Sequence, residues 1–281
     1  MLTITDHRRD SLGLKYIYVV DSRRSGGLSI GINLNTNNAC NWRCIYCQVP
    51  DLHRGTAPEA NLELLEHELS AVLCDISDGV FSEKYKIRTT NRSVRDLAIS
   101  GNGEPTTCKN FKQVISVCGR VLNSTNLGDN IKPVLITNGS LVNHTTIQES
   151  IALLSESNGE VWFKLDSATN AGLKKINNAS ISITKTRQNL EIASALCSTW
   201  IQTCVFGWKG LPPSEQEQDA YIDFIESLSG HAPGLKGVLL YGIARPSRQP
   251  EASSLSRLSP EWLDQFAKKI NKTGFEVIIN A

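Results

Sequence analysis

The chain has 281 residues, and its 29 Lys and Arg residues against 28 Asp and Glu residues give a formal net charge of +1. This balance supplies no global electrostatic attraction to nucleic acid or to a membrane surface. Apolar residues make up 40% of the chain and charged residues 20%, which excludes wholesale disorder. No apolar run approaches the ~18 residues of a membrane span, and the charged N-terminal residues do not resemble a secretory signal. We therefore expect a soluble cytoplasmic protein.

Short apolar runs alternate with helical patterns along the whole chain. In chain order, the strands are expected at Leu28–Leu34, Leu97–Ile99, Val134–Ile136, Val161–Leu165, Ile201–Phe206, Val238–Ile243 and Phe275–Ile279. Apolar residues at 3.6-residue spacing predict intervening helices that begin near 61, 111, 147, 182, 214 and 259. Ser214 with Glu217 forms a capping-box signature, and Pro260 and Gly274 mark the start and the end of the last helix.

This alternation of strands and helices predicts parallel βαβ units with right-handed crossovers. Six such units fit a partial (βα)6 TIM-like barrel, of the α/β class, better than the eight units of a complete barrel. We expect one domain over residues 1–281, with an N-terminal extension at 1–27, a barrel core at 28–245 and a C-terminal helix and strand at 246–281. In barrels the chemistry gathers at the carboxyl ends of the strands, and the polar motifs of this chain all follow strand ends.

Three of the eight cysteines, Cys40, Cys44 and Cys47, form a C-x3-C-x2-C pattern. Structural zinc sites use four protein ligands, and the sequence has no second Cys pair or His pair to complete one. A redox interpretation of Cys44 and Cys47 leaves Cys40 unexplained. Three close thiolates suit a cubane 4Fe–4S cluster in which the fourth iron stays open for another ligand. The five scattered cysteines lie on or near apolar segments, where core packing is the default interpretation.

The cysteine pattern, with Tyr46 directly before its last cysteine, resembles the radical S-adenosylmethionine superfamily. Members of that family are partial (βα)6 barrels with the cluster loop after the first strand. Their second strand ends in a Gly-Gly-Glu-like motif that receives the amino group of the methionine, and Gly101, Asn102, Gly103 and Glu104 occupy that place here. The chemistry is suitable, because glycines let backbone carbonyls approach an ammonium group and a carboxylate adds negative charge.

The resemblance implies further cofactor contacts at later strand ends. Family members often use polar groups at the end of the fourth strand for the ribose and the carboxylate, and backbone after the sixth strand for the adenine. Hydroxyl and amide groups after the third strand could supply further contacts to the carboxylate or ribose. The corresponding candidates are Thr137, Asn138, Lys164, Asp166, Tyr241 and Ile243.

Two of the basic residues are also candidates for catalysis. Lys164 could act as a Schiff-base or proton-transfer group, and pairing with a carboxylate is an equal alternative. Arg245, and more weakly Arg248, could clamp a carboxylate or phosphate of the substrate. On the fifth strand, Gln202, Thr203 and Cys204 are weaker candidates for which core packing is favoured.

The resemblance also implies a mechanism. A one-electron donor of flavodoxin or ferredoxin type reduces the 4Fe–4S cluster, which cleaves S-adenosylmethionine to methionine and a 5′-deoxyadenosyl radical. This radical abstracts hydrogen from the substrate, while the barrel orients the substrate and shields the radical. The expected activity is therefore that of an iron–sulfur oxidoreductase or lyase.

Several stretches look most similar to the wyosine-synthetase-like group: residues 32–35, 100–106, 136–139 and 162–166. Characterised members of that group build a tRNA base from pyruvate and carry a second cluster on cysteines ahead of the radical motif. No cysteine precedes Cys40 here, and the near-neutral charge does not support tRNA, so we expect a small-molecule or peptide substrate. One alternative is a tRNA- or nucleotide-modifying enzyme that uses the basic stretch at 84–95, otherwise a solvated loop. A non-catalytic iron–sulfur sensor is the other, although a sensor needs no methionine-binding loop.

Overall fold

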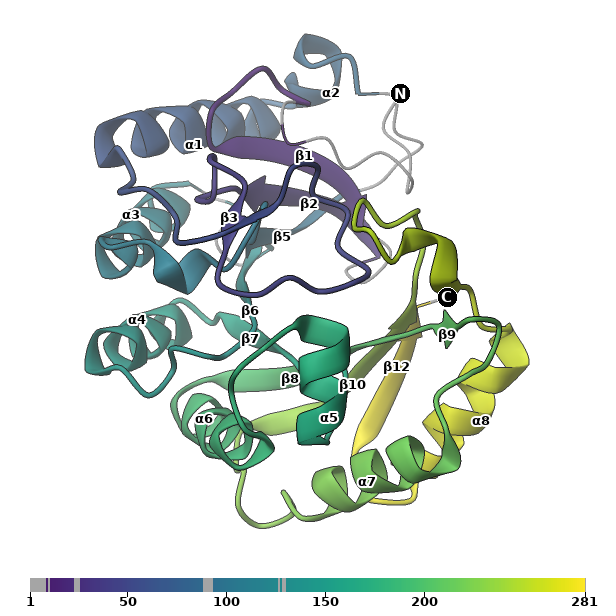
Figure 1. Cartoon of the computed structure of the whole chain (residues 1–281). Coiled ribbons are helices and arrows are strands. Elements are labelled where there is room, and N and C mark those ends of the chain that lie inside the picture. The colour runs from purple at the N-terminus through teal and green to yellow at the C-terminus, as the bar shows by residue number, and fades with distance from the viewer. Residues whose placement is uncertain are drawn as a thin grey trace.

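The centre of this computed structural model is one curved sheet of eight strands (Figure 1). The structure describes residues 9, 11–22, 26–87, 93–125, 127 and 130–280. The strands of the sheet are β1 (Ile17–Ser22), β2 (Gly27–Ile32), β5 (Val94–Ile99), β6 (Lys132–Thr137), β7 (Glu160–Lys164), β8 (Ser198–Val205), β10 (Leu235–Gly242) and β12 (Glu276–Asn280), adjacent in this order. The six strands from β2 to β10 are all parallel. This arrangement confirms the predicted partial barrel.

Two further strands extend the barrel at its edges. β12 pairs in parallel with β10 at the place where the sequence predicts a terminal strand. β1 pairs antiparallel with β2, and the sequence analysis did not predict it, because residues 1–27 were treated as an extension. Its apolar run Ile17–Val20 is buried on both faces, as β2 is. Only four residues separate the two strands, so β1 lies outside the strand–helix alternation on which the prediction relied.

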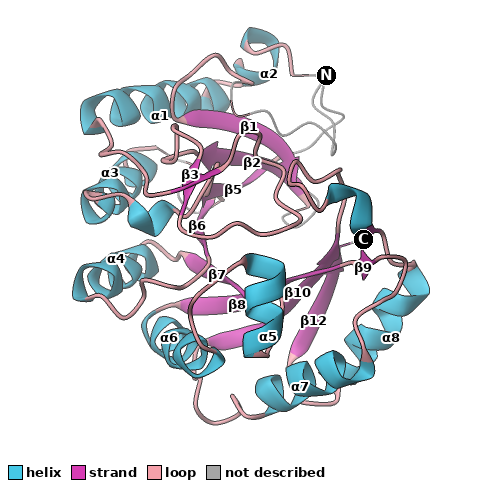
Figure 2. Ribbon diagram, viewed as in Figure 1, coloured by secondary structure: helices cyan, strands magenta, loops and turns pink. Residues whose placement is uncertain are grey.

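Helices cover the outer side of the sheet (Figure 2). They are α1 (Leu62–Ser77), α3 (Phe111–Asn123), α4 (Thr145–Glu156), α6 (Ile183–Leu196), α7 (Glu215–Glu226) and α8 (Pro260–Asn271). The side chains of Asn61, Ser182, Ser214 and Ser259 each accept a hydrogen bond from the backbone N–H three residues later, so they cap α1, α6, α7 and α8. No helix among the described residues is both long and apolar enough to cross a membrane.

Short elements lie in the loops between the main strands and helices. They are β3 (Ala39–Cys40), β4 (His53–Arg54), α2 (Phe81–Lys84), η1 (Pro105–Thr107), α5 (Asn170–Gly172), the π-helical turn η2 (Leu173–Asn177), β9 (Gly207–Trp208), η3 (Ala252–Ser254) and β11 (Leu255–Ser256). Within the basic stretch at 84–95, residues 88–92 lie outside the described residues. Lys84 ends α2 and forms a 2.7 Å ion pair with Asp75, and Arg95 lies in β5, so both ends of this stretch belong to regular elements and not to a loop.

The interior of the barrel has an apolar floor. Val134, Trp162 and Leu239 are buried together there, with Ile136 and Trp200 packed against them. Along β7 and β8, the residues two positions further toward the carboxyl ends are polar, and Lys164 and Gln202 lie in register on these neighbouring strands. Because side chains alternate across a strand, these polar groups face the same interior as the floor.

Candidate active site

The three cysteines of the C-x3-C-x2-C pattern line one cavity of about 260 Å³. Other walls of this cavity come from the loop at 100–104 after β5 and from the carboxyl ends of β6, β7, β8 and β10. Cys40 ends the short strand β3, which pairs with β4, and Cys44 and Cys47 follow in an irregular loop. The fold therefore brings the cysteines to the end of the barrel where parallel α/β proteins build their sites.

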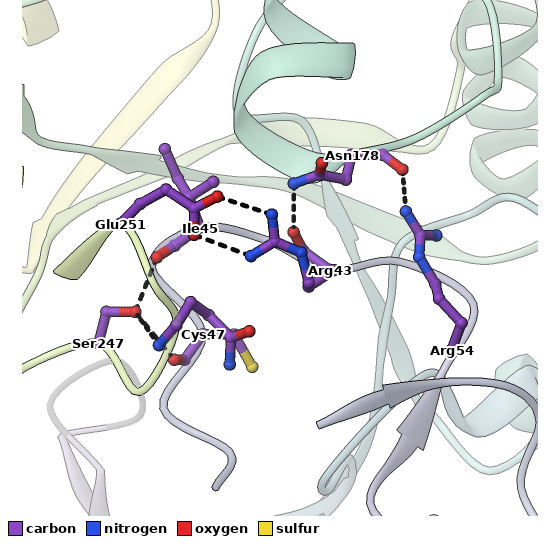
Figure 3. A network of polar contacts seen from close by, with 8 residues as sticks. Arg43, Ile45, Cys47, Arg54, Asn178, Ser247 and Glu251 are labelled. Atoms are coloured by element: carbon purple, nitrogen blue, oxygen red, sulfur yellow. Dashed lines mark hydrogen bonds and ion pairs between the residues drawn. The ribbon is translucent and has the colours of Figure 1, made fainter. Parts of the chain in front are cut away.

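One side of the cysteine loop is fixed by backbone hydrogen bonds to the end of the π-helical turn η2. The backbone N–H groups of Arg43 and Ile45 donate to the carbonyls of Asn177 and Ile176, at 3.1 and 2.8 Å. The Asn178 side chain donates to the carbonyl of Arg43 at 2.8 Å (Figure 3). These bonds satisfy polar groups of a loop that belongs to no helix or sheet ladder.

Residues 247–251 hold the other side of the cysteine loop. Ser247 Oγ donates to the carbonyl of Ile45 at 2.7 Å, and the backbone N–H of Arg248 donates to that of Cys47 at 2.8 Å. Glu251 forms a bidentate ion pair with Arg43, at 2.6 and 2.8 Å (Figure 3). The hydrogen bond from Arg43 lowers the pKa of the Glu251 carboxyl. We call residues 247–251 the strap; sequence reasoning missed it because its contacts span about 200 positions.

Burial shifts the ionisation of the cysteine thiols. Removal from water raises the pKa of Cys40 to about 11 and that of Cys44 to about 12, and it also raises the pKa of Cys47. The thiols are therefore protonated at neutral pH and release protons when they bind a metal.

The donor set can be compared with the ligands of a 4Fe–4S cluster. Cys40, Cys44 and Cys47 line the same cavity. A cubane 4Fe–4S cluster binds each cysteine through a different iron, so its ligands need not meet at one point. Three thiols around one cavity therefore suit this cluster, which the sequence analysis assigned to Cys40, Cys44 and Cys47.

Asp166, a predicted cofactor contact, ties the cysteine loop to the barrel. Its carboxylate accepts hydrogen bonds from Tyr46 Oη at 2.5 Å, from Asn177 Nδ2 at 2.7 Å and from the backbone N–H of Cys204 at 3.0 Å. Asn177 Nδ2 also lies 3.2 Å from the sulfur of Cys44. Asp166 and Tyr46 thus hold the loop in place, and Asn177, which the sequence analysis missed, donates a hydrogen bond to a cysteine of the pattern.

Glu104 of the glycine–glutamate loop (residues 101–104) is buried and saturated with hydrogen bonds. Its carboxylate accepts from Thr106 N and Oγ1, from Thr137 Oγ1 at 2.6 Å and from the backbone N–H of Asn138 at 2.6 Å. Burial raises the pKa of this carboxyl, and the four donors oppose the shift. Two predicted cofactor contacts, Thr137 and Asn138, therefore bind Glu104, which fixes the end of β6 against this loop.

The glycines of the same loop pack directly on the segment at 33–39 that leads into the cysteines. A Cβ atom on Gly103 would lie 2.1 Å from the carbonyl oxygen of Ala39, the residue before Cys40. A Cβ atom on Gly101 would lie 2.1 Å from Asn33 Oδ1. The Gly101 carbonyl accepts a 3.5 Å hydrogen bond from Arg9, with which a bound ammonium group would compete. Glycine is required here because the two backbone segments touch.

Lys164 enters the cavity from the end of β7. Its ammonium lies 3.3 Å from Tyr241 Oη and 5.1 Å from the centre of the Tyr46 ring. Burial acts to lower the pKa of Lys164, but Tyr241 and Asp166 raise it above its ordinary range. The ammonium is therefore charged at neutral pH, which favours binding of a carboxylate over nucleophilic attack.

The remaining predicted residues follow β10. Ile243 and Arg245 line the cavity with Tyr241. Arg245 Nη1 donates to Gln48 Oε1 at 3.1 Å, so it links this segment to the residue after Cys47. Arg248, which belongs to the strap, is exposed to solvent. The cavity wall thus includes the predicted cluster, cofactor and catalytic residues except Thr137 and Asp166, which bond to its lining residues Glu104 and Tyr46. The weaker candidates Thr203 and Arg248 do not line it.

Solved structures with this fold are radical S-adenosylmethionine (SAM) enzymes and their relatives. A structure of TYW1 with a lysine–pyruvate adduct has a TM-score of 0.57 at 16% identity and covers 97% of this chain and 79% of its own. A radical SAM methyltransferase from Sphaerobacter thermophilus has a TM-score of 0.55 at 13% identity, covering 90% and 66%. The structure of anSMEcpe with bound AdoMet and a peptide has a TM-score of 0.55 at 17% identity, covering 89% and 63%. The chain therefore has the partial-barrel fold that these enzymes share, as the sequence analysis expected.

Sequence comparison gives a weaker result. No family model matches the chain. Over 123 residues the chain is 25% identical to a curated protein named GTPase Obg from Brachyspira hyodysenteriae, a match that covers 44% of this chain and 15% of that protein. The chain contains no Gly-x-x-x-x-Gly-Lys-Ser/Thr phosphate-binding motif.

Proposed function

We propose that this chain is a radical S-adenosylmethionine enzyme that carries a 4Fe–4S cluster on Cys40, Cys44 and Cys47. The observation that carries the proposal is that these three thiols and the glycine–glutamate loop face one cavity at the carboxyl ends of the parallel strands. The structure of anSMEcpe, a neighbour in fold, holds bound AdoMet. When bound, cluster and cofactor supply reductive cleavage of the sulfonium and radical hydrogen abstraction from a C–H bond.

The residues of this chain would orient the cofactor. The backbone carbonyl of Gly101 is placed to accept from the methionine ammonium, and Glu104 positions the loop through its four hydrogen bonds. The charged Lys164 offers a counter-ion for the methionine carboxylate. The apolar floor around Trp162 keeps water from the interior, so a substrate held there is protected from side reactions.

The test is release of 5′-deoxyadenosine. Purified protein is reconstituted anaerobically with iron and sulfide, mixed with S-adenosylmethionine and dithionite, and analysed by mass spectrometry. We expect 5′-deoxyadenosine from the wild type and none from Cys44→Ala. Failure of the wild type to retain any cluster would refute the proposal. A loaded cluster that neither changes spectrally with S-adenosylmethionine nor yields nucleoside would favour the sensor alternative.

The electron donor would dock beside the cysteine loop. Four exposed cationic residues belong to segments that bond to this loop: Arg54, Lys174, Lys175 and Arg248. The guanidinium of Arg54 donates to the carbonyls of Asn41 and Asn178, which places it on the loop itself. The acidic face of a flavodoxin- or ferredoxin-type protein would complement these positive charges, which are local because the whole chain is nearly neutral.

Charge reversal tests the docking site. Lys174→Glu combined with Lys175→Glu should slow cluster reduction by an acidic flavodoxin about tenfold at low ionic strength. Reduction by dithionite should not change, because this small reductant needs no docking surface. The matched control is Lys268→Glu with Lys272→Glu, two exposed residues at the end of α8. Equal slowing by both pairs would show a general charge effect and not a docking site.

A further inference from the structure

Gln202 on β8 is buried in the cavity wall with no hydrogen bond to its side chain. Its exposed fraction is 0%, and it lines the cavity. Among the described residues, neither its amide oxygen nor its amide nitrogen has a hydrogen-bond partner. A buried amide that has left water without forming hydrogen bonds destabilises the fold. Such a group needs an explanation, and at a cavity wall a ligand that completes its bonds is one.

Gln202 differs from the other buried amides of the described residues. Asn280 lacks a partner at its side-chain nitrogen, and Asn35, Asn177 and Asn189 each lack one only at the side-chain oxygen. Their nitrogens donate to Ala39, Asp166 and Gly139 respectively. Each of these amides is therefore fixed by the protein. In the part of the chain that the structure describes, Gln202 alone has an amide with both its donor and its acceptor unpaired.

The neighbours of Gln202 do not use its side chain. Lys164, in register on β7, is directed to Tyr241 Oη. Leu239, in register on β10, belongs to the apolar floor with Trp162. The unpaired amide of Gln202 therefore lies between Lys164, which is already hydrogen-bonded to Tyr241, and the apolar floor. A ligand at this depth would place an apolar body over the floor and a polar edge against Gln202.

The amide geometry selects the chemistry of that edge. A glutamine amide presents one acceptor and one donor side by side in one plane. A group with an N–H next to a C=O on the same side, as in a primary carboxamide or a lactam ring, satisfies both atoms. A carboxylate is an acceptor only, so it would bond the nitrogen and leave its charge against the oxygen of Gln202.

We propose that Gln202 recognises the substrate, and that the substrate carries a primary carboxamide or lactam edge on an apolar body. This inference rests on the proposed function, because it assigns the cavity beside the cofactor to the substrate. Asp166 and Glu104 are buried and hydrogen-bonded within the protein, so their role is to hold the loops of the site in place. Gln202 is buried without such bonds, so its amide can bind a ligand.

Binding of matched small probes tests the proposal. The cluster-loaded protein with S-adenosylmethionine is titrated with benzamide, N,N-dimethylbenzamide and benzoate, and thermal unfolding is followed. Only benzamide has both an N–H and a C=O, so it should raise the Tm of the wild type while the other two do not. Gln202→Met should weaken benzamide binding at least tenfold. Equal shifts by benzoate, or equal benzamide binding by the variant, would overturn the proposal.

Stability without any probe provides a second measurement. Gln202→Met removes an unpaired amide and should raise the Tm, since the replacement has a similar size. The control is Gln218→Met, because Gln218 donates to the carbonyl of Pro213 and accepts from Lys269, and its loss should lower the Tm. If Gln202→Met lowers the Tm as the control does, Gln202 is structural and the proposal fails.

Two further results separate this proposal from the proposed function. The binding measurements need no turnover, so they can fail while the wild type still releases 5′-deoxyadenosine. A tenfold loss of S-adenosylmethionine affinity in Gln202→Met would assign Gln202 to the cofactor and overturn the substrate role.

Discussion

Replacing Gly103 with alanine should separate the glycine–glutamate loop from the cysteine loop. The new Cβ atom would lie 2.1 Å from the carbonyl oxygen of Ala39, so one backbone segment must move by about an ångström to reach ordinary contact. That carbonyl accepts a 2.8 Å hydrogen bond from Asn35 Nδ2, which also donates to Glu104 O at 3.3 Å. The movement therefore strains a buried amide that holds both loops.

The cost can be estimated from these contacts. Overpacking a tight interior site costs about 1–3 kcal/mol, and weakening a buried hydrogen bond adds about 1 kcal/mol. We expect Gly103→Ala to lower the free energy of unfolding by about 3 kcal/mol. For a chain of this size that corresponds to a fall in Tm of about 6 °C. Because Ala39 precedes Cys40, the displaced loop should also retain less iron after reconstitution.

Urea denaturation followed by circular dichroism measures the stability, and iron analysis measures the loading. The control is Gly119→Ala within α3, where the added Cβ atom meets only Ser157 Oγ, at 3.0 Å. Alanine favours helix over glycine by about 1 kcal/mol, so this variant should be as stable as the wild type or more so. A Gly103→Ala protein that is equally stable and fully loaded would refute the argument that backbone contact requires glycine here.

Three other predictions concern the cysteine loop. Cys44→Ala should lose the visible absorption of the reconstituted cluster, whereas Cys74→Ala, which removes an exposed cysteine, should keep it; equal loss in both would mean that the assigned ligands are wrong. Burial raises the pKa of Cys40 to about 11, so the rate at which Cys40 is alkylated in the metal-free protein should rise about tenfold per pH unit from pH 7 to 9. Mass spectrometry measures this rate, and a rate that does not change with pH would contradict the prediction. Asn177→Ala removes a donor 3.2 Å from Cys44 Sγ. If this hydrogen bond contributes about 1 kcal/mol, the midpoint potential of the reconstituted cluster should fall by about 40 mV. A redox titration followed by electron paramagnetic resonance that shows no change would exclude this role.

Sequence patterns predicted the barrel because short apolar runs mark its strands and apolar residues at 3.6-residue spacing mark its helices. The capping serines and Asn61 have local signals that operate within four residues, and they cap the helices where expected. β1 was missed although β2, which is equally buried, was predicted. Only four residues separate β1 from its antiparallel partner β2, too few for a crossover helix, so β1 lies outside the strand–helix alternation on which the prediction relied.

The candidate site was predicted only as far as its motifs extend. The cysteines and the glycine–glutamate loop have characteristic spacing, so the sequence placed them at neighbouring strand ends. Their polar partners have no such signal: Glu251 contacts Arg43 across 208 positions, and Asn177 reaches Cys44 across 133. The structure also shows that Glu104 is turned toward Thr137 and Asn138, which no pattern along one segment could indicate.

The strap has a consequence for the order of events during synthesis. The cysteine loop is complete in the chain by residue 47, but its clamp on one side is formed by Ser247, Arg248 and Glu251. While the chain is being made, the thiols leave the ribosome about 200 residues before these partners do. The loop therefore cannot take its final shape until most of the barrel has been synthesised. If the loop holds a 4Fe–4S cluster, as proposed above, iron and sulfide meet a correctly shaped site only late in synthesis or after it.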